Sequence, residues 1–260
     1  MTASYGVTDR FSLSLTLPFS RGTHSRYYAD GVRHEVTAGG LGDVSLIGTA
    51  WLFSPAAHVD GNLAIGIGLK APTGKHDAID AYYLRSGATQ FSVDQSIQPG
   101  DGGWGVILQA QAFQHLLVRS YGYASGSYLV SPKNQTDVIQ GQSGPYSAVR
   151  VSVPDVFSAR AGVGYELSPN PGVSVRLGGR LDGIPFRDLV GGSDGFRRPA
   201  IIWYLEPGVT IGRGRNAIFI DVPVRVYSNF RPSALDMQLG QAGGGDLANY
   251  LLLAAYQFRF

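Results

Sequence analysis

The sequence contains no cysteine, only three lysines and few charged residues of any kind. The absence of cysteine excludes disulfide bonds and thiolate metal sites, and it suits a route through an oxidising periplasm. Charged residues make up 15% of the chain, whereas an average soluble domain has about 25%. So few charges would cover a soluble protein of this size thinly, and we expect much of its surface to meet lipid.

Further absences limit the class of protein. No apolar run approaches the roughly 18 residues of a membrane-spanning helix. No signal peptide is visible at Met1, so we expect the numbering to begin after its cleavage or inside a longer chain. The formal net charge of +2 argues against nucleic acid as a partner. Of the 21 basic residues 18 are Arg, a side chain that suits paired, fixed positions better than a solvated surface.

What the sequence does contain is alternation of apolar and polar residues with a period of two, which predicts β-strands. Eleven such segments span about 2–8, 11–19, 43–53, 62–72, 104–115, 120–130, 157–167, 173–184, 201–212, 216–228 and 250–260. In the segment 216–228, Ile218, Ile220 and Val224 share one face, while Asp221 and Arg225 lie on the other. Most of the predicted strands therefore have one apolar and one polar face.

The last predicted strand ends on an aromatic residue. Its even positions from 250 to 260 are all apolar or aromatic, while Gln257 and Arg259 lie on the opposite face. A final strand that closes on a C-terminal Phe is typical of bacterial outer-membrane β-barrels, in which the assembly machinery recognises that residue. We therefore interpret Phe260 as an assembly signal.

The connections between the predicted strands alternate in length. Short connections near 9–10, 54–61, 116–119, 168–172 and 213–215 alternate with long ones over 20–42, 73–103, 131–156, 185–200 and 229–249. Short periplasmic turns and long extracellular loops are typical of outer-membrane barrels. The alternative is a soluble sandwich or lipocalin-like barrel, in which the apolar face would form the core.

We therefore predict an all-β fold, an antiparallel transmembrane β-barrel that forms a single domain over residues 1–260. Both ends of such a barrel lie in the periplasm, which requires an even number of strands. Eleven visible strands predict a twelfth, which either precedes Met1 or lacks a clear alternating pattern. The expected location is the outer membrane of a Gram-negative bacterium, with membrane lipid, lipopolysaccharide and the barrel-assembly machinery as partners.

Three motifs in the first part of the chain carry a family resemblance. They are residues 40–46 (GLGDVSL), 66–74 (GIGLKAPTG) and 98–104 (QPGDGGW). In this order they resemble the outer-membrane transporter family named for the MetA pathway of phenol degradation, with its G-x-G-D, G-x-K-x-P-T-G and Q-P-G-x-G segments. The resemblance implies an outer-membrane channel for small, often hydrophobic or aromatic compounds.

The candidate functional residues are charged side chains on the polar faces. A charge that faced lipid near the bilayer centre would cost about 2–4 kcal/mol, so these residues are expected to line the lumen. They are Arg160, Glu166, Arg176, Arg180, Asp182, Glu206, Asp221, Arg225 and Arg259, together with Lys70 on an earlier strand. We hypothesise that Arg176, Arg180, Glu206, Asp221 and Arg225 form one connected network. Such a wall is either a structural salt-bridge network or a nearly charge-balanced selectivity lining.

Several local motifs resemble catalytic or ligand-binding signatures but lack their context. Residues 191–195 (GGSDG) match Gly-x-Ser-x-Gly in a long polar loop that we expect to be flexible, without the strand–turn–helix setting of a hydrolase. Residues 71–76 lack P-loop spacing, and residues 212–215 (GRGR) predict a tight turn. An outer-membrane hydrolase is thus the disfavoured alternative, and we expect no enzymatic activity and no catalytic residue.

No two of the five histidines have metal-binding spacing on one strand face. His24, His34 and His76 lie in predicted outer loops, where a weak metal site is the alternative, but we expect no metal and no cofactor. The loops also carry aromatic residues, which are Tyr27, Tyr28, Tyr82, Tyr83, Phe91, Tyr146, Phe186 and Phe196. They are interpreted as an outer aromatic girdle, or alternatively as an inward plug or a contact for partners.

The function predicted from these features is an outer-membrane channel for passive uptake of small solutes, hydrophobic or aromatic ones among them. The competing hypothesis is a structural barrel that anchors or houses a partner protein in a larger outer-membrane complex.

Overall fold

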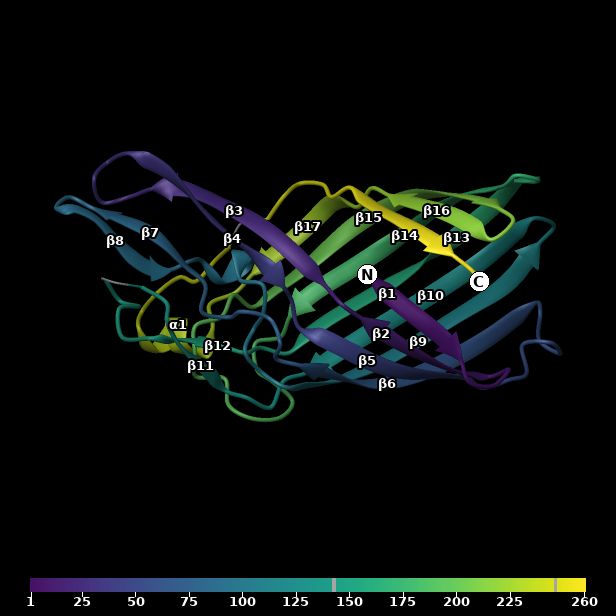
Figure 1. The fold of residues 1–260 in the computed structure, drawn as a ribbon, viewed down its shortest axis with the longest axis horizontal. Helices are drawn as coiled ribbons and strands as arrows, with labels where there is room; N and C mark the ends of the chain where they lie inside the picture. The colour runs from purple at the N-terminus through teal and green to yellow at the C-terminus, as the bar shows by residue number, and fades with distance from the viewer. Residues whose placement is uncertain (142–143, 246) are drawn as a thin grey trace.

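The computed structural model describes residues 1–141, 144–245 and 247–260, and it is built almost entirely of antiparallel β-strands (Figure 1). The strands of the main sheet are β1 (Thr2–Gly6), β2 (Phe11–Thr16), β5 (Val44–Trp51), β6 (Gly61–Ala71), β9 (Gly105–Leu117), β10 (Ser120–Val130), β13 (Val156–Pro169), β14 (Gly172–Ile184), β15 (Ala200–Arg213), β16 (Asn216–Asp221), β17 (Val224–Phe230) and β18 (Leu253–Phe258). They pair in the order β1-β2-β5-β6-β9-β10-β13-β14-β15-β16-β18, and β17 also pairs with β15.

All eleven predicted strand segments lie in this sheet, so the all-β, antiparallel prediction is confirmed. The segment predicted as 216–228 is one bent strand, since its halves β16 and β17 both pair with β15. The break falls at Val222-Pro223, where proline lacks the N–H that a ladder requires.

The structure does not confirm that the sheet closes into a barrel. The sheet curls so that its edge strands, β1 and β18, both run across the face shown in Figure 1. Among the described residues no hydrogen-bond ladder joins these two edges. No helix in the described parts of the chain is long and apolar enough to cross a membrane.

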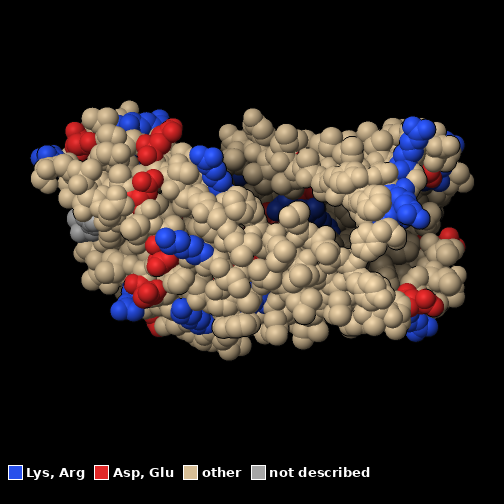
Figure 2. Space-filling view, in the orientation of Figure 1, with Lys and Arg blue, Asp and Glu red and all other residues tan. Residues whose placement is uncertain are grey.

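The apolar face of the sheet is the exposed one. In β15, Ile201, Trp203 and Leu205 are 43–48% exposed, whereas Ile202 and Glu206 on the opposite face are 5% exposed. A soluble sandwich would bury the first set, so the structure has the reverse arrangement. Figure 2 shows the consequence, a wide band of uncharged residues between two charged ends, with charged atoms recessed where this face is hollowed.

The long connections contain more regular structure than the alternating pattern alone predicts. They hold the hairpins β3 (Phe19–Tyr27) with β4 (Arg33–Leu41) and β7 (Ile79–Leu84) with β8 (Gly87–Ser92), the pair β11 (Gln135–Ile139) with β12 (Arg150–Ser152), and the short helices η1 (Gln95–Ile97) and α1 (Ala234–Gln238). These elements project together at the long-loop end of the sheet (Figure 1).

Most of the loop aromatics pack within these loop elements. Tyr28 makes edge contacts with both Tyr82 and Tyr83, at centroid distances of 5.4 Å. Beneath them Val36, Ala38, Ala78 and Val93 form a small buried cluster. Tyr146 packs against Phe196 in the same way, at 5.1 Å.

The inner face of the sheet is shaped by glycines beneath tyrosine rings. The Tyr121 ring occupies the space above Gly164, and the Tyr123 hydroxyl lies above Gly162 and Gly178. A Cβ on Gly178 would lie 2.5 Å from the Tyr123 Oη and 2.6 Å from the carbonyl oxygen of Ala161. The rings therefore lie along the wall, because the residues beneath them have no side chains.

This packing predicts that Gly178→Val destabilises the protein, whereas Gly179→Val does not. Overpacking at residue 178 should cost about 1–3 kcal/mol. Gly179 faces outward with nothing within 4 Å of an added Cβ, so its change should stay within about 0.5 kcal/mol. Urea unfolding in detergent micelles, followed by tryptophan fluorescence, measures both. Equal effects at the two positions would contradict the close packing of the inner face.

Candidate functional site

The inner face of β13 to β16 carries a charged wall. Cross-strand register places its six charged side chains on the same face of four neighbouring strands. They form three ion pairs, Arg160 Nη1 to Glu206 Oε1 at 3.2 Å, Arg176 Nη2 to Asp221 Oδ1 at 2.7 Å, and Arg180 Nε to Asp182 Oδ2 at 2.8 Å. Three cations thus face three anions, which leaves this wall formally neutral.

The charged wall keeps some unused hydrogen-bonding capacity. The Oε2 atom of Glu206 and the Nη1 atom of Arg180 are shielded from solvent, yet neither has a partner among the described residues. Buried polar atoms without a partner are uncommon and call for an explanation such as bound water or a ligand. The middle of this wall is therefore suited to contact a polar group inside the protein.

The remaining predicted lumen residues lie elsewhere. Arg225 donates to Leu247 O at 2.8 Å and to Asn249 Oδ1 at 2.5 Å, so it joins the last long connection rather than the hypothesised network. Arg259 is exposed and Glu166 is half-buried, both towards the short-turn end of the sheet. The sequence predicted that five residues on the polar faces form a single network. The structure instead shows separate ion pairs, with Arg225 bound to a loop.

The opposite wall of the inner face, formed by β1, β2, β5 and their neighbours, carries hydroxyl and amide groups instead of charges. Hydroxyl pairs cross the β1–β2 ladder, with Thr2 and Thr16 at 3.0 Å and Ser4 and Ser14 at 2.8 Å. Next to them Gln109 Nε2 donates to Thr49 Oγ1 at 2.8 Å, across β6. The interior thus has one charged and one uncharged polar wall.

The family-like motifs meet at a single point, which we call the clasp: Asp43, Lys70, Gly74 and Asp101. The Asp43 carboxylate accepts from Gly74 N at 2.9 Å and from Asp101 N at 3.0 Å. The Lys70 ammonium group donates to Asp43 at 3.3 Å and also to Asp101. The clasp ties the long connection 73–103 to the ends of β5 and β6, so Lys70 holds a loop as well as belonging to the inner face.

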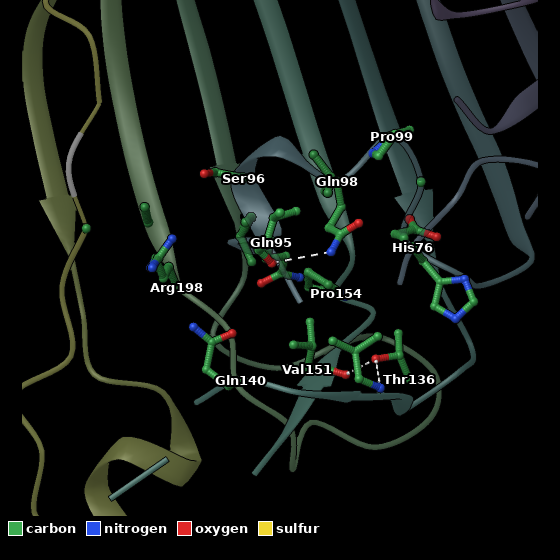
Figure 3. A pocket seen from close by; sticks show the side chains of 18 of the residues that line it. His76, Gln95, Ser96, Gln98, Pro99, Thr136, Gln140, Val151, Pro154 and Arg198 are labelled. Atoms are coloured by element: carbon green, nitrogen blue, oxygen red, sulfur yellow. Dashed lines mark hydrogen bonds between the residues drawn. The ribbon is translucent and has the colours of Figure 1, made fainter. Parts of the chain in front are cut away.

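Between this connection and the strand ends lies a cavity of about 540 Å³ (Figure 3), which we call the vestibule. Its walls include Val93, Val138 and Val151 from the loops, and Ile202 and Phe230 from the inner face of the sheet. Because the same space touches both groups, it joins the loop region to the interior of the sheet. No single sequence motif marked it, since its lining comes from many stretches that lie far apart in the chain.

The polar groups of the vestibule are largely engaged already. Gln98 accepts from Ala78 N at 2.9 Å and donates to Ala78 O and Val93 O. Gln95 donates to Ser152 O at 3.1 Å. What remains available to an occupant is mainly the aliphatic and aromatic lining.

One ion pair bridges two loops beside the vestibule. Both Nη atoms of Arg198 donate to the Asp94 carboxylate, at 3.2 and 3.1 Å. Burial alone would raise the pKa of Asp94, but the hydrogen bonds and charge of Arg198 outweigh it and hold that pKa well below its ordinary value. Asp94 is therefore ionised at neutral pH, and the bridge is charged on both sides.

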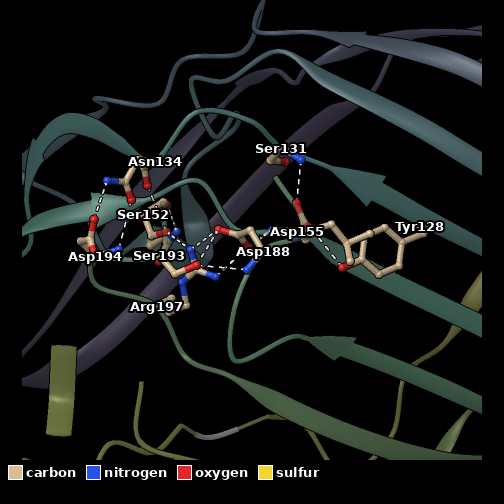
Figure 4. A network of polar contacts seen from close by, with 11 residues as sticks. Tyr128, Ser131, Asn134, Ser152, Asp155, Asp188, Ser193, Asp194 and Arg197 are labelled. Carbon is tan, nitrogen blue, oxygen red and sulfur yellow. Dashed lines mark hydrogen bonds and ion pairs between the residues drawn. The ribbon is translucent and has the colours of Figure 1, made fainter. Parts of the chain in front are cut away.

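The loop that contains Ser193 is fixed by a polar network rather than flexible (Figure 4). The Arg197 guanidinium binds the Asp188 carboxylate, with both side chains fully buried, and donates to Ser152 Oγ at 2.6 Å. Ser193 Oγ accepts a hydrogen bond from Asp188 N at 3.0 Å, so its hydroxyl stabilises the backbone of the turn. The predicted flexibility of this loop was wrong, because it rested on the glycines of the loop and not on its Asp and Arg.

Two of the three loop histidines, His34 and His76, each pair with one acid. His34 lies 2.7 Å from Asp30, and His76 lies 3.0 Å from Asp137. Within the described residues no three His, Asp or Glu side chains gather as a metal site would require.

Comparisons with known proteins bear on the fold. No family model and no curated protein matches the sequence. The structure is similar to a solved one described as the crystal structure of the COG4313 outer membrane channel from Pseudomonas putida F1, with a TM-score of 0.62 and 16% identity over 98% of this chain and 80% of that chain. At this identity the likeness shows a shared fold and leaves the MetA-pathway resemblance untested.

Glu206→Gln is expected to lower stability, because Arg160 then lacks a carboxylate. The loss should be about 1–2 kcal/mol, less than for a fully buried pair, since Arg160 is 35% exposed. The same change removes one negative charge from the interior, so any ion conductance should shift towards anions. Thermal unfolding and reversal potentials measure the two effects. Glu35→Gln, an exposed loop change, is the control, and an equal loss there would contradict the assignment.

Arg198→Gln is expected to raise the pKa of Asp94 and so to weaken the pH dependence of stability in the Asp94 loop. In the native protein the depressed pKa gives stability that is present above about pH 4, the unfolded value, and is lost as the pH falls below it. Without the cation, burial still raises the pKa of Asp94 and the hydrogen bond from Ser96 N at 2.9 Å still lowers it, so the pKa should rise and the loss of stability in acid should shrink. Titration of the Asp94 carboxyl carbon by NMR measures the shift. Arg187→Gln is the control, and an unchanged pKa in Arg198→Gln would contradict the bridge.

Proposed function

We propose that this protein is an integral outer-membrane channel of a Gram-negative bacterium, which admits small solutes through the interior of its curved sheet. Two general features support the proposal. The exposed face is apolar and the enclosed face is polar, as lipid outside and water inside require. The fold resembles that of a protein described as an outer membrane channel.

The observation that carries the proposal is the vestibule. Its 540 Å³ volume falls within the range of about 300–1,000 Å³ that suits small-molecule sites. Its lining includes the inner-face residues Asp182, Ile184 and Ile202. A solute in the vestibule would therefore lie at the long-loop end of the polar interior. Its available surface is mainly apolar, which favours small hydrophobic or aromatic solutes.

Two further parts of the proposal concern biogenesis and surroundings. Phe260 is 89% exposed at the end of the chain, which is compatible with recognition by the barrel-assembly machinery. The charged ends and uncharged middle in Figure 2 fit membrane lipid around the strands and lipopolysaccharide around the loops.

A structural barrel that holds a partner protein is the second candidate. It is favoured by the three ion pairs of the charged wall, which would fill a narrow interior. The two candidates differ in one measurable property, because only a channel conducts.

We expect stepwise conductance when the purified protein is inserted in planar bilayers. Ile202→Trp should lower it several-fold, because the side chain faces the vestibule and is only 5% exposed. Ile201→Trp, which changes the neighbouring outward residue, should leave conductance unchanged and serves as the matched control. Silent bilayers from protein that copurifies with stable subunits would overturn the channel and support the structural role.

A further inference from the structure

The loop between β14 and β15 exposes two adjacent aliphatic side chains. Leu189 is 68% exposed and Val190 is 54% exposed, and Arg187 beside them is also exposed. A single exposed aliphatic residue needs no explanation, but adjacent ones at a loop apex indicate a contact surface.

The backbone beneath these side chains is held by a buried carboxylate. Asp155 accepts three hydrogen bonds, from Tyr128 Oη at 2.9 Å, from Ser131 N at 2.7 Å and from Leu189 N at 2.9 Å (Figure 4). Its own N–H donates to Asp188 Oδ1 at 2.9 Å. One buried side chain therefore links the ends of β10 and β13 to the residue that carries the exposed leucine.

The other side of the apex is held by close backbone contact. Gly191 adopts a positive φ of 91°, and a Cβ there would lie 2.4 Å from Pro132 O. Only glycine fits so close to the 131–133 segment. The polar side of the loop is thus satisfied within the protein, while its apolar side faces outward.

The tip of the β14–β15 loop lies beside the apolar outer face, at the long-loop end of the sheet. Tyr128, whose hydroxyl shares Asp155 with Leu189, stacks on Phe157 at 6.4 Å with an 11° angle between the rings. Register pairs Tyr128 with Leu108, which is 44% exposed on that outer face. The aliphatic pair therefore continues the surface that the strands present to lipid.

We propose that Leu189 and Val190 form a fixed membrane anchor, inserted among the lipid acyl chains of the leaflet on the long-loop side. The inference rests on the proposed function, since it needs the strands to span a bilayer. Lipid is the occupant because the pair continues the apolar outer face, and because Arg187 places a cation where anionic headgroups lie. The 185–199 loop then rests on the membrane instead of extending into water.

The absence of cysteine allows a direct test, because any introduced thiol is the only one in the chain. Leu189→Cys, Val190→Cys, Leu205→Cys and Val32→Cys are each labelled with a nitroxide and reconstituted into phosphatidylcholine–phosphatidylglycerol vesicles. Accessibility to oxygen, which partitions into lipid, and to a water-soluble nickel chelate is then measured by electron paramagnetic resonance. Leu205 reports the outer face of β15, and Val32 reports the distant tip of the β3–β4 hairpin.

Lipid-type accessibility at 205 and at either 189 or 190, with water-type accessibility at 32, is the expected result. Water-type accessibility at both 189 and 190, with lipid-type accessibility at 205, would overturn the anchor and leave the channel proposal standing. Water-type accessibility at 205 would overturn the membrane-spanning sheet itself, and the anchor with it. Asp155→Asn in the Leu189→Cys background should shift residue 189 towards water, since the loop loses its charged acceptor.

Discussion

The antiparallel ladder that runs from β1 to β18 is the constraint on which the rest of this structure depends. Because every ladder turns alternate side chains to opposite faces, a single register decides what meets the outside and what is enclosed. In this chain the exposed face is aliphatic and aromatic, and the enclosed face carries the hydroxyls, amides and ions. A slip by one residue in any strand would place its charges on the apolar surface.

Side chains pack in two different ways on this inner face. On one side, short hydroxyl side chains pair across the strands. On the other, glycines make room for tyrosine rings, and Arg160 and Arg176 each have an acid as partner. The inner face is therefore largely polar, and the three ion pairs of the charged wall leave that wall with a formal net charge of zero.

The long connections matter because buried ionic contacts make them part of the folded body. The clasp holds one connection to β5 and β6, and Asp155 with the Arg197–Asp188 pair holds two others to β10 and β13. With the loops held at both places, the vestibule between them has defined walls. The Arg198–Asp94 bridge joins two further connections beside this space, with the Asp94 side chain buried and the Arg198 side chain partly exposed.

The sequence by itself determined the class of fold, the eleven strand segments, the alternating connections and the sharing of faces by charged residues, because these follow from a local period of two. It also marked the residues of the clasp as motifs, without revealing that they meet. Only the tertiary structure decided which ions pair. Arg225 and Arg180 were both predicted on the polar face of their strands, yet they contact different partners. The loop hairpins, the vestibule and the buried Asp155 and Asp188 were likewise beyond the sequence. The partners of Asp155 lie 24 to 34 positions away along the chain, and a local pattern carries no record of such separations.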